Sequence, residues 1–317
     1  MLLVGNSMVK ITTLLLLLSL SLFARDVIDE SGSCKINWSQ GHIICEGESE
    51  AGQTRFAAKI AAKVIAQRNL LEVVQGVRID SLTTVRDGLL SSDVIRSRVQ
   101  GVIRGAQIVS NEYIKNDGYA VAKVKLTMGS DLLNALLSDP KKLTWNEKIE
   151  KFWNNISFIA QANASTYTHK DTDVVKKVMQ DLRDGGYKKA SDYIQTLLEK
   201  SDKNNYTGIL IDVSGLNSFK KAMIVRLVDA KGKEIYPGNL ITKKMLVKKN
   251  TSVGYIFGHN DALQNKRVFN DPIEIKAKNI YKNRHSDILL DASQLEKISS
   301  LDKSIFENAK ILLLLGE

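Results

Sequence analysis

The chain has 317 residues, enough for two domains of ordinary size, and its hydrophobic share of 44% and charged share of 25% are those of a globular protein. This composition excludes a fibrous or wholly disordered chain. The formal net charge of +10 favours an acidic partner or an anionic surface.

The N-terminus predicts export. Lys10 precedes an apolar run over residues 11–23, which is too short to span a bilayer comfortably and ends at Ala24. This pattern predicts a secretory signal peptide over residues 1–24, cleaved before Arg25, with an uncleaved anchor as the alternative. No cysteine stands at the end of this apolar run to accept a lipid, so we expect no lipid attachment there. We place the protein in the periplasm, with peripheral outer-membrane association open, and expect no nucleic-acid partner there.

Residues 34–128 predict an α+β domain that begins with a hairpin. Its turn is expected at Ser39-Gln40-Gly41, so Cys34 and Cys45 would lie opposite one another. An oxidising compartment favours a disulfide between these two cysteines, with two free buried thiols as the alternative.

A long helix over residues 53–76 is the central element of this domain. Its polar stripe is Arg55, Lys59, Lys63 and Gln67, and we expect the opposite side to face a sheet through Ala57, Ile60, Ala61, Val64 and Ile65. Beyond Gln67 the stripe breaks, and three aliphatic side chains turn onto the other side. They form a candidate interface with the second domain or a neighbouring subunit, made of Leu70, Val73 and Val74.

The rest of the chain continues the α+β pattern. A strand is expected over residues 77–85. Within residues 89–103 we expect a short helix that starts at Ser92 or Asp93 as its cap and ends before Gly101 or Gly105. A hairpin follows over 107–128 and turns at Asn116-Asp117-Gly118. Residues 129–205 predict a helical connecting region, with helices at 130–137, 145–161 and 173–200. Residues 206–317 predict a second, β-rich α+β domain that ends in a buried strand.

The sequence contains few groups arranged for catalysis. It has no phosphate-binding glycine loop, no nucleophile elbow and no histidine pair at helical spacing. His259 and Asp261 are the one polar pair with acid–base potential, and Asp212, Asp229 and Asp291 are expected to cap or form turns. We therefore predict no catalytic residue, no metal and no cofactor. A basic patch for an anionic partner is expected at Lys243, Lys244, Lys248 and Lys249.

Three stretches carry a resemblance to a known family. They are CEGESEAGQTRFAAKIAAKVIAQRNLLEVVQGVRI, SSDVIRSRVQGVIRGAQIV and GYAVAKVKLTM, with Gly47 or Gly52, Gly76, Gly101 and Tyr119-Ala120-Val121 in the places that the pattern requires. The chain here resembles the twenty-kilodalton surface lipoprotein family, which is similar to the N-terminal domain of flagellar assembly protein T and to the flagellar disk lipoprotein FlgP. The resemblance implies an envelope scaffold, and the missing lipid-attachment cysteine implies a FlgQ-like partner of a FlgP-like lipoprotein.

The function expected from the sequence is therefore that of a non-enzymatic, exported assembly protein of the bacterial envelope that serves the flagellar motor. Its expected partners are envelope or flagellar disk proteins, with a homo-oligomer left open. One alternative is a periplasmic enzyme with an interdomain cleft around His259 and Asp261. The other is a module that binds anionic lipid or lipopolysaccharide through the patch of four lysines.

Overall fold

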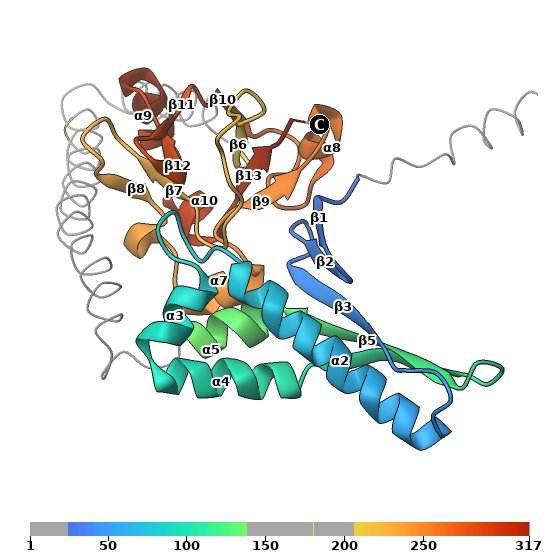
Figure 1. The fold of residues 1–317 in the computed structure, drawn as a ribbon. Coiled ribbons are helices and arrows are strands. Elements are labelled where there is room, and N and C mark those ends of the chain that lie inside the picture. The colour runs from blue at the N-terminus through green and yellow to red at the C-terminus, as the bar shows by residue number, and fades with distance from the viewer. Residues whose placement is uncertain (1–24, 138–179, 181–205, 317) are drawn as a thin grey trace, which may run out of the picture.

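The computed structural model describes residues 25–137, 180 and 206–316. The expected signal peptide, and the connecting helices expected at 145–161 and 173–200, lie outside the described residues. Helices and sheets are mixed in both described parts of the chain, which confirms the predicted α+β class (Figure 1). We call residues 25–137 the first unit and residues 206–316 the second unit.

A five-stranded antiparallel sheet forms the base of the first unit. Its strands lie in the order β1-β2-β3-β5-β4, so β1 and β4 are the two edges. β1 lies before the predicted start of the domain at residue 34. The alternation expected in the second hairpin is confirmed, because Ala120, Ala122, Val124 and Leu126 are buried. The bounds are β1 (Ile28–Ser31), β2 (Cys34–Asn37), β3 (His42–Glu48), β4 (Gln107–Ile114) and β5 (Tyr119–Thr127).

The predicted long helix is α2 (Arg55–Gly76), and it lies across this sheet (Figure 1). Thr54 caps its N-terminus by accepting a hydrogen bond from the backbone N–H of Ala57. The sheet-facing side chains are not the predicted ones. They are Ala58, Ala62, Ala66, Leu70 and Val74, all fully buried, whereas Ile60 and Val64 point into solvent.

Close contact between helix and sheet explains why the predicted face was wrong. A Cβ atom added to Gly47 of β3 would lie 2.2 Å from the backbone nitrogen of Ala66 and 2.5 Å from the carbonyl oxygen of Ala62. At this spacing only alanine fits beneath the helix, so the larger residues lie on its outer side.

Two further helices and a loop complete the first unit. Residues 77–84 form a loop with a single bridge between Arg78 and Thr84, and not the predicted strand, because the Asp80 carboxylate accepts the N–H groups of Leu82 and Thr83 in a tight turn. The expected short helix is α4 (Asp93–Arg104), and Ser92, one of the two predicted caps, caps it. A further helix, α3 (Val85–Ser91), precedes it and was not predicted. The π-helix η1 (Met128–Leu133) and α5 (Asn134–Leu137) follow β5.

The second unit contains two four-stranded sheets with parallel pairing that the sequence pattern did not predict. In one sheet, of order β10-β6-β13-β9, all neighbours are parallel. In the other, of order β11-β12-β7-β8, only β12 and β7 are parallel. The strands are β6 (Ile209–Asp212), β7 (Arg226–Val228), β8 (Glu234–Tyr236), β9 (Gly254–Ile256), β10 (Ile273–Lys276), β11 (Asn279–Tyr281), β12 (Arg284–Leu289) and β13 (Ile311–Leu314).

Short helices connect these strands. One of them is α9 (Ala292–Ser299), and the closing strand β13 is buried as predicted. The others are the 3-10 turn η2 (Gly238–Leu240), α7 (Lys243–Lys249), α8 (His259–Gln264) and α10 (Lys303–Glu307).

The two units share one continuous hydrophobic core. The indole of Trp38 meets the ring of Tyr255 edge-on, with 5.6 Å between centroids, and the backbone N–H groups of Met223 and Ile224 donate to the carbonyls of Arg78 and Ile79. The junction between the units is therefore packed as a protein interior is, which fixes the C-terminal half of α2 in place.

Candidate functional site: the outer face of the long helix

His259 and Asp261 have ordinary structural surroundings. His259 begins α8, about half-exposed, and its Nε2 atom lies 2.9 Å from Oε2 of Glu274 on β10. Asp261 lies in the first turn of the same helix, beside Gly258. Glu274 is the acidic partner of His259, and half-exposed ion pairs of this kind are common on protein surfaces.

The three aspartates at strand ends have the roles predicted for them. Asp212 accepts the N–H and hydroxyl of Ser214, and Asp229 accepts the N–H groups of Lys231 and Lys233 in the turn before β8. Asp291 caps α9, and the hydrogen bond from Lys278, followed by those from Gln294 and Ser293, holds the pKa of its carboxyl well below the usual value.

The four predicted lysines lie together on α7. Lys243, Lys244 and Lys248 are exposed, and the Lys243 ammonium donates to the carbonyl of Leu137 at 2.7 Å. Burial, and then neighbouring cations, lower the pKa values of Lys243 and Lys249. The patch is therefore a real cluster of charge, but α7 has no large exposed apolar side chain beside it.

Cys34 and Cys45 form the predicted disulfide. They are directly paired in the register of β2 and β3, and both side chains are buried. A disulfide is compatible with an exported protein. Its buried position makes it a structural bond rather than a reactive group.

A buried ion pair is the strongest polar feature of the junction. Asp287 of β12 is fully buried and accepts two hydrogen bonds from Arg226 of β7, at 2.9 and 2.5 Å. The same guanidinium donates to the hydroxyl of Ser81, in the loop after α2, at 2.6 Å. Half-buried Glu234 lies nearby, and burial raises its pKa to about 7. The hydrogen bond between Arg226 and Ser81 joins the second unit to the first.

The predicted interface at Leu70, Val73 and Val74 lies at the same junction. Leu70 and Val74 are fully buried in the shared core, and Val73 is half-buried against it. The second half of α2 is thus covered by the chain itself, so Leu70 and Val74 offer no surface to a partner.

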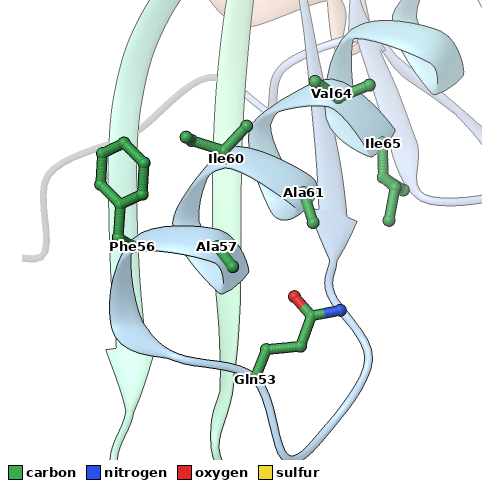
Figure 2. A pocket seen from close by; sticks show the side chains of 7 residues that line it. All are labelled: Gln53, Phe56, Ala57, Ile60, Ala61, Val64 and Ile65. Carbon is green, nitrogen blue, oxygen red and sulfur yellow. The ribbon is translucent and has the colours of Figure 1, made fainter.

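The first half of α2 carries the largest exposed apolar residues of the helix. Phe56 is 78% exposed, Val64 56% and Ile60 48%. Figure 2 shows these three side chains following one another along one side of the helix, with Ala57, Ala61 and Ile65 along the neighbouring side. Together with Gln53 they line a shallow, open depression. We call these six apolar residues the outer face of α2.

A row of basic residues borders the outer face. Arg55, Lys59 and Lys63 line a second shallow depression together with Phe56, Ile60 and Asn111. The sequence pattern identifies this basic row, but assigns the apolar residues beside it to the sheet. A second row of alanines, Ala58, Ala62 and Ala66, could have revealed that the sheet lies on the other side of the helix. A strand that contains a glycine, as β3 contains Gly47, can pack closely against such a row.

Metal-binding clusters and membrane-spanning helices are both absent from the part of the chain that the structure describes. Across residues 25–137 and 206–316 there is no group of three or more His, Cys, Asp or Glu side chains able to hold a metal ion. Over the same residues, none of the helices is both long enough and apolar enough to cross a membrane.

Residues 208–317 match the family model for the second domain of Treponema pallidum Tp0624. The second unit is similar to that domain. The match covers nearly all of the second unit and leaves the first unit, with α2 and its outer face, outside it. No curated protein matches the chain.

Proposed function

We propose that this protein is an exported, non-enzymatic assembly protein of the bacterial cell envelope, and that it serves the flagellar motor as a scaffold needed for motility. The observation that carries the proposal is the outer face of α2. Three large apolar side chains in a row on one helix are costly to expose to water, and such patches on a folded protein mark interaction sites.

The roles of the polar groups support a scaffold over an enzyme. The aspartates cap turns and helices, and His259 pairs with Glu274 at the surface. Arg226 is held by Asp287 and donates across the junction to Ser81. Each of these groups is explained by the fold, so a catalysed reaction is not needed to account for them.

The rigid attachment of α2 suits it to presenting a binding surface. Tyr113 and Asn111 of the edge strand β4 donate to the carbonyls of Gln53 and Lys59, at 3.0 and 3.1 Å. With alanines packed beneath and these two hydrogen bonds at the side, the helix holds its outer face in one orientation.

The motor role rests on the resemblance of the first unit to the surface lipoprotein family and its flagellar relatives. In this proposal the partners are envelope or flagellar disk proteins, among them a FlgP-like lipoprotein, and the location is the periplasm at the outer membrane. The disulfide agrees with that compartment.

The experiment that tests the proposal is deletion of the gene, followed by swimming assays and tomographic imaging of the motors. We expect reduced motility and loss of density around the motor. A second strain carries Ile60→Asp, and a matched control carries Leu90→Asp, since Leu90 is also strongly exposed but lies on α3, outside the outer face. Intact motors and normal swimming in the deletion strain would contradict the motor role.

A further inference from the structure

We infer that the outer face of α2 binds the surface of an anionic phospholipid bilayer. In this arrangement Phe56, Ile60 and Val64 enter the boundary between headgroups and acyl chains, and Arg55, Lys59 and Lys63 contact the phosphates. The inference rests on the proposed envelope location and names the surface that the protein would bind there.

The geometry is that of a helix lying in a membrane interface. Such helices have an apolar side that enters the acyl boundary and basic residues along its border. The outer face of α2 projects from the sheet, because its opposite side is held against β3 by Ala62 and Ala66. Because the depression along the outer face is shallow and open, this side of the helix can meet a flat partner without any change in the fold.

The charge along α2 favours an anionic surface. From residue 55 to residue 71 the helix carries Arg55, Lys59, Lys63 and Arg68, and its first acidic residue is Glu72. Three of these cations, Arg55, Lys59 and Lys63, line the depression beside the outer face. Each basic side chain close to an anionic membrane raises the affinity by about fivefold, so this row contributes substantially.

A second copy of this chain is a poorer occupant for the same face. In an antiparallel pair of α2 helices the two basic rows would lie on the same side of the contact, so that like charges face each other. Neither helix carries an acidic residue within the outer face to compensate them.

The patch on α7 is a poorer membrane site than the outer face. It has the lysines, but Leu246 is buried, and α7 carries no large exposed apolar residue to insert. Apolar insertion together with basic contacts distinguishes the outer face of α2 from a patch of charge alone.

The test uses the full-length exported protein, purified from the envelope, and lipid vesicles with no other protein present. Sedimentation with vesicles of phosphatidylcholine alone is compared with vesicles that also contain phosphatidylglycerol, at low and at high salt. We expect binding to the anionic vesicles that weakens with salt. Ile60→Asp should weaken it by about tenfold or more, because an aliphatic insertion is replaced by a charge.

Matched variants separate binding through the outer face from binding elsewhere on the protein. Lys59→Gln with Lys63→Gln should lower binding to anionic vesicles by about twenty-fivefold, at about fivefold for each lysine, and leave folding unchanged. Phe56→Trp should retain binding, and its added fluorescence should be quenched by brominated acyl chains. Leu90→Asp and Lys244→Gln with Lys248→Gln should bind as the unchanged protein does.

Several results would overturn the inference. The inference fails if the unchanged protein does not bind anionic vesicles, or if Ile60→Asp binds them as tightly as the unchanged protein. It also fails if only the variant with Lys244→Gln and Lys248→Gln loses binding. If Ile60→Asp instead converts a dimer to a monomer in sedimentation, the occupant is a second copy. If vesicles fail but a purified acidic envelope protein binds, the occupant is that protein. A failure with vesicles leaves the outcome of the gene deletion and motor imaging unaffected.

Discussion

The two halves of α2 place their large side chains on opposite sides of the helix. In the first half, Phe56, Ile60 and Val64 point outward and only alanines face the sheet. In the second half, Leu70 and Val74 point inward, into the core that the two units share. One continuous helix therefore has an exposed apolar end and a buried apolar end.

The difference follows from what lies beneath each half. Below the first half, Gly47, Ala120 and Ala122 bring the strands so near that no side chain larger than alanine fits. In the second half, Leu70 and Val74 are buried in the core cluster that includes residues of both units. Since the inner side of the first half is already filled by small residues, its large residues on the outer side are not required by the fold. They are therefore available for the binding that we propose.

The largest loss of stability is expected from a substitution at the junction of the two units. Asp287→Ala would leave Arg226 buried without its carboxylate, and breaking a buried pair in this way costs about 3–5 kcal/mol of unfolding free energy. Chemical denaturation measures it. The exposed pair of Lys278 and Asp291 provides the control, because water screens it and Lys278→Ala should change the unfolding free energy far less. Equal effects from the two changes would contradict the structural role assigned to the buried pair.

The second largest loss of stability is expected for Leu70→Ala, in the second half of α2. Leu70 is fully buried in the shared core, and removing a buried leucine side chain costs about 2–5 kcal/mol. Urea denaturation of Leu70→Ala beside Leu90→Ala makes the comparison, since Leu90 is 73% exposed. A small loss at Leu70 would mean that this half of the helix is not covered as the structure shows.

A smaller effect is expected on the inner side of the first half. In Gly47→Ala the new methyl group would meet the backbone of Ala66 at 2.2 Å, so helix and strand must separate, at about 1–3 kcal/mol. Gly101→Ala on α4 is the control, because its Cβ would meet nothing within 4 Å and alanine favours a helix. Thermal unfolding should show the first variant destabilised and the second unchanged or stabilised.

The sequence predicted the elements of the first unit better than it predicted which residues they bury. Hydrophobic periodicity located α2, and turn residues located both hairpins, because these signals are local. The inward side of α2 was predicted wrongly, since the pattern gives weight to large apolar residues and none to a glycine on a distant strand. The parallel pairing of strands in the second unit was not predicted for the same reason: the paired strands are far apart in the chain. The same error assigned residues of the outer face to the sheet, although the basic row beside the outer face was predicted correctly.

The smallest effect on stability, and the sharpest comparison with Leu70, is expected for Ile60→Ala. Ile60 is about half-exposed and points away from the sheet, and alanine is the better helix former, so the unfolding free energy should change by no more than about 0.5 kcal/mol. The same substitution removes apolar surface from the centre of the outer face, so binding to anionic vesicles should weaken while the fold is kept. The measurement is therefore a pair: urea denaturation and vesicle sedimentation on one preparation, with Leu70→Ala carried through both. Leu70→Ala should lose stability and, where still folded, keep its binding. A loss of stability at Ile60 as large as that at Leu70 would mean that the first half of α2 is covered after all. The outer face would then belong to the fold, and its side chains would no longer be free to meet a membrane.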